Sequence, residues 1–172
     1  MTASEIDDAR ISEFTLALME ATGWYEVDYS MAEPFFWGKG KGCNFIRGKC
    51  VETGGTPNFD EFCSPLMEYG CTHSGRSQGF CGTTQIRTGT VSSSMNYWGN
   101  NTIVSDSFAD NCPYFAAYSN LDCENPAHKK LAELPSAESY GYGSRCFSGS
   151  FRETAASSIT LTYCFQFQVR IP

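Results

Sequence analysis

The stretch that decides the fold runs from Ser12 to Phe45 and reads SEFTLALMEATGWYEVDYSMAEPFFWGKGKGCNF. Its first ten residues have the period of a helix, because apolar side chains recur at i, i+3, i+4 and i+7, namely Phe14, Ala17, Leu18 and Ala21. Leu16 and Met19 lie on roughly the opposite side. A helix that is apolar nearly all round is normally buried inside a larger domain, and only eleven residues precede this one. The sequence therefore predicts a helix without a partner in this chain, and we expect the chain to be the tail end of a larger protein.

The two ends of this helix are marked by their residue types. Ser12 suits the N-cap, and Glu13 places a negative charge in the first turn, where the helix dipole favours it. Gly23 can adopt the left-handed conformation that ends a helix. An aromatic segment follows through Trp37, and residues 38–42 are typical of a loop.

Length and charge limit the class of protein. The 172 residues suffice for one domain, or for a small domain plus part of another. Acidic residues outnumber basic ones 19 to 12, which argues against general nucleic-acid binding. The sequence contains neither an apolar run near the ~20 residues of a membrane span nor a signal peptide at Met1. We therefore predict no nucleic-acid partner and no transmembrane segment in this chain.

The cysteines indicate a secreted protein, whereas the polar N-terminus contains no secretion signal. There are nine, at Cys43, Cys50, Cys63, Cys71, Cys81, Cys112, Cys123, Cys146 and Cys164. None forms a Cys-x-x-Cys pair, so a zinc ribbon is disfavoured, and dispersed cysteines in a Gly- and Ser-rich chain indicate disulfides made in an oxidising compartment. The alternative is a set of buried thiols in a cytosolic protein. On the disulfide interpretation a secretion signal is expected upstream of Met1, and at least one cysteine has a partner outside the chain or none.

The rest of the chain falls into two regions. Residues 43–146 show little periodicity and are expected to be loop-rich, with one short helix from Pro126 to Leu134 capped by Asn125. Residues 157–171 alternate apolar and polar side chains with period two, which predicts a half-covered antiparallel strand. We expect its hairpin partner to follow Pro172.

Candidate catalytic groups are few. His73 and His128 lie 55 residues apart without the spacing of a metal site, so we interpret both as surface or turn histidines. No nucleophile elbow or phosphate-binding loop is present. Asn100-Asn101-Thr102 is a glycosylation sequon, and we take Asn100 as a candidate glycosylation site.

Several sequence segments together resemble the leishmanolysin-type zinc metallopeptidases, which are metzincins. The specific part covers residues 15–45, and weaker similarity in order and spacing extends through Phe62-Cys63, Arg76 to Cys81, Asn111-Cys112-Pro113, Asp122-Cys123 and Ser144 to Phe147. The resemblance implies a catalytic domain that ends with the 12–22 helix and leads into a cysteine-rich C-terminal domain. We accordingly expect an α+β fold, with residues 1–42 ending the catalytic domain and residues 43–172 forming a cysteine-rich domain of short antiparallel strands, which we expect to be incomplete.

Members of this family bind zinc through His-Glu-x-x-His and a third histidine, and the Glu is the general base on the zinc-bound water. This sequence has no His-Glu-x-x-His, and Met1 resembles the family's Met-turn. The resemblance therefore places the zinc ligands and the base upstream, with no catalytic or metal-binding residue in this chain. Zinc is implied for the full-length protein only, and we expect this chain alone not to cleave peptides.

The resemblance also implies a disulfide pairing, which the sequence alone leaves open among 105 arrangements of eight cysteines. The implied pairs are Cys50–Cys112, Cys63–Cys81, Cys71–Cys146 and Cys123–Cys164. Cys43 would pair with a cysteine of the missing catalytic domain.

The expected function is that of the C-terminal part of a leishmanolysin-like zinc metalloendopeptidase, secreted or associated with the cell surface or membrane. Its partners would be peptide or protein substrates, reached through the catalytic domain, and the family is also linked to cell adhesion. Two alternatives stay open: a stand-alone cysteine-rich adhesion or binding module, and a gene fragment that is not made as such.

Overall fold

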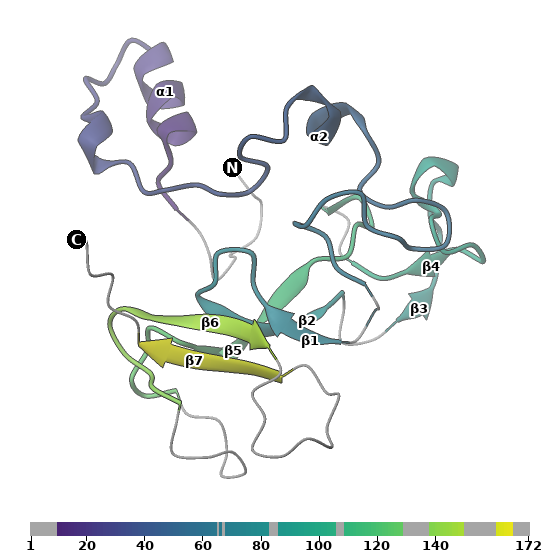
Figure 1. Ribbon diagram of the computed structural model, residues 1–172. Coiled ribbons are helices and arrows are strands. Elements are labelled where there is room, and N and C mark those ends of the chain that lie inside the picture. The colour runs from purple at the N-terminus through teal and green to yellow at the C-terminus, as the bar shows by residue number, and fades with distance from the viewer. Residues whose placement is uncertain are drawn as a thin grey trace.

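A computed structural model describes residues 10–64, 66, 68–82, 86–105, 109–128, 138–149 and 161–166. The helices are α1 (Glu13–Ala21), the 3-10 helix η1 (Tyr29–Met31), α2 (Cys43–Arg47) and the 3-10 helix η2 (Ser93–Met95). The strands are β1 (Tyr69–Cys71), β2 (Ser77–Cys81), β3 (Arg87–Thr88), β4 (Thr102–Ile103), β5 (Phe115–Asp122), β6 (Ser144–Gly149) and β7 (Leu161–Gln166). Few helices, short antiparallel strands and four disulfides make this an α+β fold, as predicted (Figure 1).

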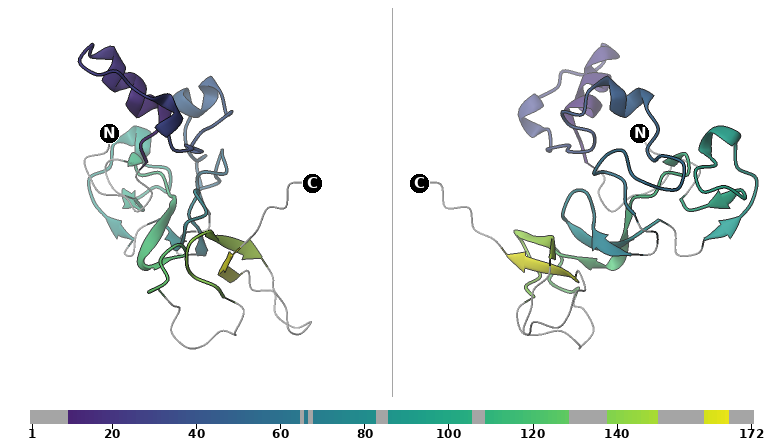
Figure 2. Two further views of the ribbon diagram at one scale, coloured as in Figure 1. Left: turned by 90° about the vertical axis from the view of Figure 1, so that its left-hand side faces the viewer. Right: turned by 45° about the vertical axis from the view of Figure 1, so that its right-hand side comes forward.

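The predicted helix is confirmed, with both of its ends. The Ser12 side chain accepts the backbone N–H of Thr15 at 3.4 Å, as an N-cap does. Gly23 has φ +71°, and its N–H donates to the carbonyl of Glu20 at 2.9 Å, which terminates the helix. No residue of α1 is buried, and Figure 2 shows the helix projecting from the rest of the chain in both views.

A three-stranded antiparallel sheet in the order β1-β2-β5 forms the centre of the molecule. All five residues of β2 are buried, because this strand has a neighbour on each side. Gly79 of β2 faces Ala117 of β5, and a Cβ at Gly79 would lie 2.3 Å from the carbonyl oxygen of Ala116. The close approach of the two backbones therefore requires glycine at this position.

The predicted C-terminal strand corresponds to β7, and residues 157–160 and 167–171 of the prediction lie outside the described part of the chain. Its partner is β6, which precedes it in sequence, so the expectation of a partner after Pro172 is wrong for this edge. The predicted solvent face is also wrong, since Thr162 is 3% exposed and Cys164 fully buried. These two side chains are held inward because Cys164 is cross-linked to Cys123 and the Thr162 hydroxyl donates to the Gln78 side chain at 3.2 Å.

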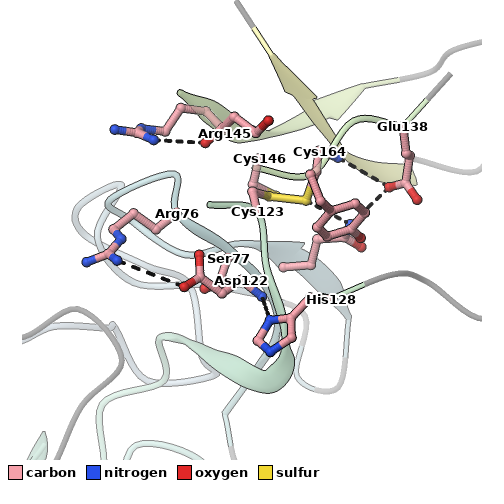
Figure 3. Close-up of a disulfide and its surroundings, with 12 residues drawn as sticks. Arg76, Ser77, Asp122, Cys123, His128, Glu138, Arg145, Cys146 and Cys164 are labelled. Atoms are coloured by element: carbon pink, nitrogen blue, oxygen red, sulfur yellow. Dashed lines mark hydrogen bonds and ion pairs between the residues drawn. A yellow bond between two sulfur atoms is a disulfide. The ribbon is translucent and has the colours of Figure 1, made fainter. Parts of the chain in front are cut away.

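Gln78 of β2 is the centre of a buried polar network that joins the sheet to the β6–β7 hairpin. Its Nε2 donates to Glu138 Oε1 at 3.0 Å and to the Tyr140 hydroxyl at 3.1 Å. Glu138 Oε1 also accepts the backbone N–H of Cys164 at 3.2 Å (Figure 3). Because buried polar groups are costly when unpaired, the network fixes the position of the hairpin on the sheet.

Disulfides take the place of a large apolar core. Half-cystines make up most of the buried apolar residues in the described part of the chain, together with Val51, Phe80, Val104 and Tyr163. Close to the Cys123–Cys164 bond, Arg76 pairs with Asp122 at 3.9 Å (Figure 3). Arg76 also pairs with Glu124 at 3.0 Å, and Arg145 pairs with the same carboxylate. With few large aliphatic side chains to bury, the fold depends on its cross-links.

The β3–β4 hairpin with η2 makes a lobe that Asn111 holds together. Asn111 Oδ1 accepts the N–H of Val104 at 2.8 Å, and its Nδ2 donates to the carbonyls of Thr102 and Met95 at 2.9 and 3.0 Å.

The predicted helix at 126–134 is not present where the chain is described. Pro126 and Ala127 form a turn, capped by the Asn125 side chain, and residues 129–134 lie outside the described residues.

Candidate functional site

Residues 11–33, here called the arm, form a self-contained excursion of the chain. Its two ends meet at Ile11 and Glu33, where the N–H of Glu33 donates to the Ile11 carbonyl at 2.8 Å. The N–H of Ile11 in turn donates to Glu33 Oε2 at 3.0 Å. Inside the arm, the Tyr29 hydroxyl donates to Glu20 Oε2 at 2.7 Å, which ties η1 to α1 and raises the pKa of the Tyr29 phenol. The arm is therefore closed on itself by hydrogen bonds.

The large apolar side chains of the arm are exposed rather than buried. Phe14 is 76% exposed, Trp24 84% and Met31 72%. Leu16, Met19, Tyr25, Val27 and Met31 line an open hollow together with Glu26 and Asp28. A contiguous apolar surface of this kind marks an interaction site more often than a solvated face.

Trp37 joins the arm to the disulfide-linked remainder of the chain, residues 43–166, here called the body. Its ring meets four others edge-on, with centroid distances of 5.4 to 6.4 Å, from Phe45, Phe62, His73 and Tyr114. Edge-to-face pairs of this geometry stabilise beyond the area that they bury. Gly38 follows Trp37 with φ +68°, and a Cβ there would lie 2.5 Å from the Phe45 ring, so the turn requires glycine.

Two acidic residues of the body complete this joint. Glu61 is 2% exposed, and its Oε1 accepts the N–H of Gly38 at 3.1 Å. Lys41 donates to Asp60 at 2.8 Å. This hydrogen bond lowers the pKa of the Asp60 carboxyl and raises that of Lys41. The loop of residues 38–42 is thus fastened to the body by one buried and one exposed contact.

Cys43 begins α2, next to this joint, and its thiol is exposed and unpaired. The other eight cysteines form Cys50–Cys112, Cys63–Cys81, Cys71–Cys146 and Cys123–Cys164, which are the pairs that the resemblance implies. The exposed thiol is therefore on the first residue of the body, where the chain arrives from the arm.

The two histidines are not brought together into a site. His73 is exposed and packs against Trp37. His128 lies in the turn after β5, where its Nδ1 accepts the N–H of Asp122 at 3.1 Å (Figure 3). Among the residues that the structure describes, no group of three His, Cys, Asp or Glu side chains could hold a metal ion. Met1 lies outside the described residues, and Asn100 is exposed at the turn between β3 and β4.

Sequence reasoning did not identify Trp37 and Glu61 as the joint. Trp37 carries no periodic signal, and its partners lie 8 to 77 residues further along the chain, at Phe45, Phe62, His73 and Tyr114. The only hint was the density of aromatic residues between Trp24 and Trp37, followed by the glycine-rich loop.

The part of the chain that the structure describes contains no helix with the length and apolar character needed to span a membrane.

The geometry defines a disulfide-stabilised α+β chain that presents an apolar arm, a class of structure suited to packing against another polypeptide. The Peptidase_M8 family model, described as leishmanolysin, matches residues 1–168, and the chain belongs to this family. It is 30% identical over 181 residues to a leishmanolysin-like peptidase of Drosophila pseudoobscura pseudoobscura, and 31% identical over 151 residues to leishmanolysin of Leishmania major. Each match covers 87% of this chain, but only 26% and 25% of those relatives, so the chain spans about a quarter of their length.

Proposed function

We propose that this chain is the C-terminal part of a leishmanolysin-like zinc metalloendopeptidase and works as the support of a catalytic unit. The observation that carries the proposal is the family match over residues 1–168, in a chain that spans about a quarter of its relatives. On this proposal residues 1–42 complete the catalytic domain, and residues 43–172 form the cysteine-rich domain that follows it. The reaction of the whole protein is hydrolysis of peptide bonds in peptide or protein substrates.

The arm supports this role through its exposed apolar side chains. Phe14 and Leu18 lie on one face of α1, with exposed fractions of 76% and 49%, and Trp24 follows the helix. Burying a side chain of this size contributes roughly 1.5–3 kcal/mol, so a covering domain would gain several such contributions. We infer that the rest of the catalytic domain covers the arm.

Cys43 gives the proposal a covalent element. Its thiol is exposed beside the joint, whereas the other eight cysteines are all paired within the chain. We infer that Cys43 forms a disulfide with a cysteine of the catalytic domain. That bond would fix the two parts at the point where the chain passes from one to the other.

The described residues of this chain do not fit a zinc site, because they offer no cluster of His, Cys, Asp or Glu ligands. In the proposal the zinc ligands and the general base belong to a His-Glu-x-x-His helix elsewhere in the protein. The residues of this chain bind and orient that unit, and the chain by itself does not hydrolyse peptides. Four disulfides in so small a chain support a secreted or cell-surface protein.

The transcript tests the proposal directly. Sequencing the full messenger RNA upstream of the Met1 codon is expected to find His-Glu-x-x-His in the same reading frame, with a secretion signal before it. An in-frame stop codon a short distance before Met1, with no such motif, contradicts the proposal. That result would favour a stand-alone cysteine-rich module.

A further inference from the structure

We propose that Asn100 carries an N-linked glycan. The proposal is independent of the peptidase assignment and needs only that the chain enters the secretory pathway. Asn100-Asn101-Thr102 is the one Asn-x-Ser/Thr sequence in the chain. The acceptor is the Asn100 side-chain amide, and the donor is an oligosaccharide linked to a lipid pyrophosphate.

The transfer is chemically balanced without an oxidant or reductant. Nδ2 of Asn100 forms a bond to the anomeric carbon of the first sugar and gives up one proton to a base of the transferase. The bond from that carbon to the pyrophosphate oxygen breaks, and the lipid pyrophosphate leaves with the electron pair. The Thr hydroxyl two residues after the acceptor is the part of the sequon that the transferase recognises.

The fold leaves room for a glycan at this position. Asn100 and Asn101 have φ of 51° and 53°, so they form the left-handed middle of the Gly99–Thr102 turn directly before β4, and both are exposed. The N–H and the hydroxyl of Thr102 both donate to the Gly99 carbonyl, at 3.1 and 2.9 Å, so the turn closes without the Asn100 side chain. A bulky group on Asn100 therefore disturbs no hydrogen bond that holds the described residues of this turn.

The neighbouring asparagine of this lobe shows the contrast. Asn111 is 6% exposed, and its amide makes three hydrogen bonds to the backbone. A glycan there would break the lobe, and its sequence, Asn111-Cys112-Pro113, lacks the sequon. The one sequon of the chain thus coincides with an amide that the fold leaves exposed.

The glycan would also leave the apolar arm open. The β3–β4 hairpin lies at the far side of the molecule from α1 (Figure 1). A second view at 45° keeps the two apart (Figure 2). A hydrated sugar chain on Asn100, directly before β4, therefore adds bulk and solubility to the body without covering the arm.

The test is to express the whole chain behind a secretion signal in a eukaryotic cell, and to analyse cell lysate and medium together. We expect intact mass spectrometry to show one N-linked glycan. Peptide N-glycosidase F should remove it and convert Asn100 to Asp. Asn100→Gln and Thr102→Ala should each abolish the mass shift, whereas Thr102→Ser should retain it.

Asn101→Gln is the matched control, because it changes the adjacent exposed amide and keeps the sequon; it should retain the glycan. Counting free thiols in each variant shows whether the four disulfides have formed, which separates a lost glycan from a misfolded chain. Wild-type chain with its disulfides formed but without a glycan in either fraction would overturn the proposal. So would a glycan that survives Asn100→Gln.

Discussion

The backbone N–H of Gly38 donates to the buried carboxylate of Glu61 across 3.1 Å, and this bond fastens the exit of the arm to the body. The second carboxylate oxygen of Glu61 is buried without a hydrogen-bond partner among the described residues. A single oxygen atom, Oε1 of Glu61, thus accepts the hydrogen bond from the turn that Gly38 begins. The joint is therefore sensitive to the loss of that atom.

Replacing Glu61 with alanine is expected to lower the free energy of unfolding by about 1.5–3 kcal/mol, because a hydrogen bond to a charged group is lost and the half-buried Gly38 loses the acceptor of its N–H. Chemical denaturation measures the change. Glu61→Gln keeps an acceptor oxygen at the same place and should cost less than half as much. Equal destabilisation by the two substitutions would show that the charge, and not the hydrogen bond, matters.

Trp37→Ala should destabilise the joint through lost packing. A fully buried Trp loses about 3–5 kcal/mol on truncation, and Trp37 is only half-buried, so we expect about 2–3 kcal/mol. Trp37→Phe keeps part of the edge-to-face contacts with Phe62 and His73 and should retain at least half of the lost stability. A Trp37→Ala variant as stable as wild type would contradict the assignment of Trp37 as the centre of the joint.

The arm should bind apolar probes in the isolated chain. Phe14→Ser together with Leu18→Ser removes two exposed apolar side chains and should lower the fluorescence of bound ANS severalfold. Because both sites are exposed, stability should change by less than about 0.5 kcal/mol for each substitution. Ile46→Ser, an 85% exposed position on α2, is the control and should leave ANS binding nearly unchanged.

Removal of the Cys123–Cys164 disulfide should cost the fold about 4 kcal/mol, since the bond closes a loop of 41 residues. The double Cys→Ser variant at these positions is compared with wild type by denaturant titration. The same change at Cys63 and Cys81, which close only 18 residues, should cost about 3 kcal/mol on the chain-entropy model. A reversed order would show that native contacts, such as the Gln78 network, outweigh loop length.

The Lys41–Asp60 pair predicts a weak dependence of stability on acid. The hydrogen bond from Lys41 holds the pKa of Asp60 below its ordinary value in the folded chain. The stabilisation of the fold by this pair is therefore present above the unfolded pKa of the Asp60 carboxyl, about 3.9. It is lost as the pH falls through the lowered pKa that this carboxyl has in the folded chain. Asp60→Asn should reduce stability slightly at pH 7 and leave it unchanged near pH 2, as measured by thermal unfolding. Because the pair is exposed, high salt should remove the difference at pH 7.

Local signals in the sequence predicted local structure well. Ser12 and Gly23 determined both ends of α1, because a cap residue acts within its own turn. Period-two alternation predicted β7 and the burial of Tyr163, but it assigned the partner strand wrongly and missed the burial of two residues on the polar face. Thr162 and Cys164 are buried by contacts with Gln78 and Cys123, which lie 84 and 41 residues away. No periodicity within a strand contains that information.

The short strands and the joint could not be predicted from pattern. β3 and β4 have two residues each, too few for any period to be read, and Asn111 holds them through side-chain bonds that depend on the whole lobe. Trp37 draws its partners from four separate segments. The resemblance to leishmanolysins, in contrast, implied the disulfide pairs that the structure holds, because relatives preserve the distant pairings that a single sequence does not reveal.

The central claim is that this chain works as part of a larger peptidase, and isolation of the natural polypeptide tests it most directly. An antibody raised against the body would capture the protein from its source, for sizing under non-reducing conditions and assay with a peptide substrate. The account predicts a polypeptide several times longer than 172 residues whose peptide hydrolysis is abolished by a metal chelator and restored by zinc. Capture of a 19.0 kDa chain alone, without chelator-sensitive hydrolysis, would contradict it.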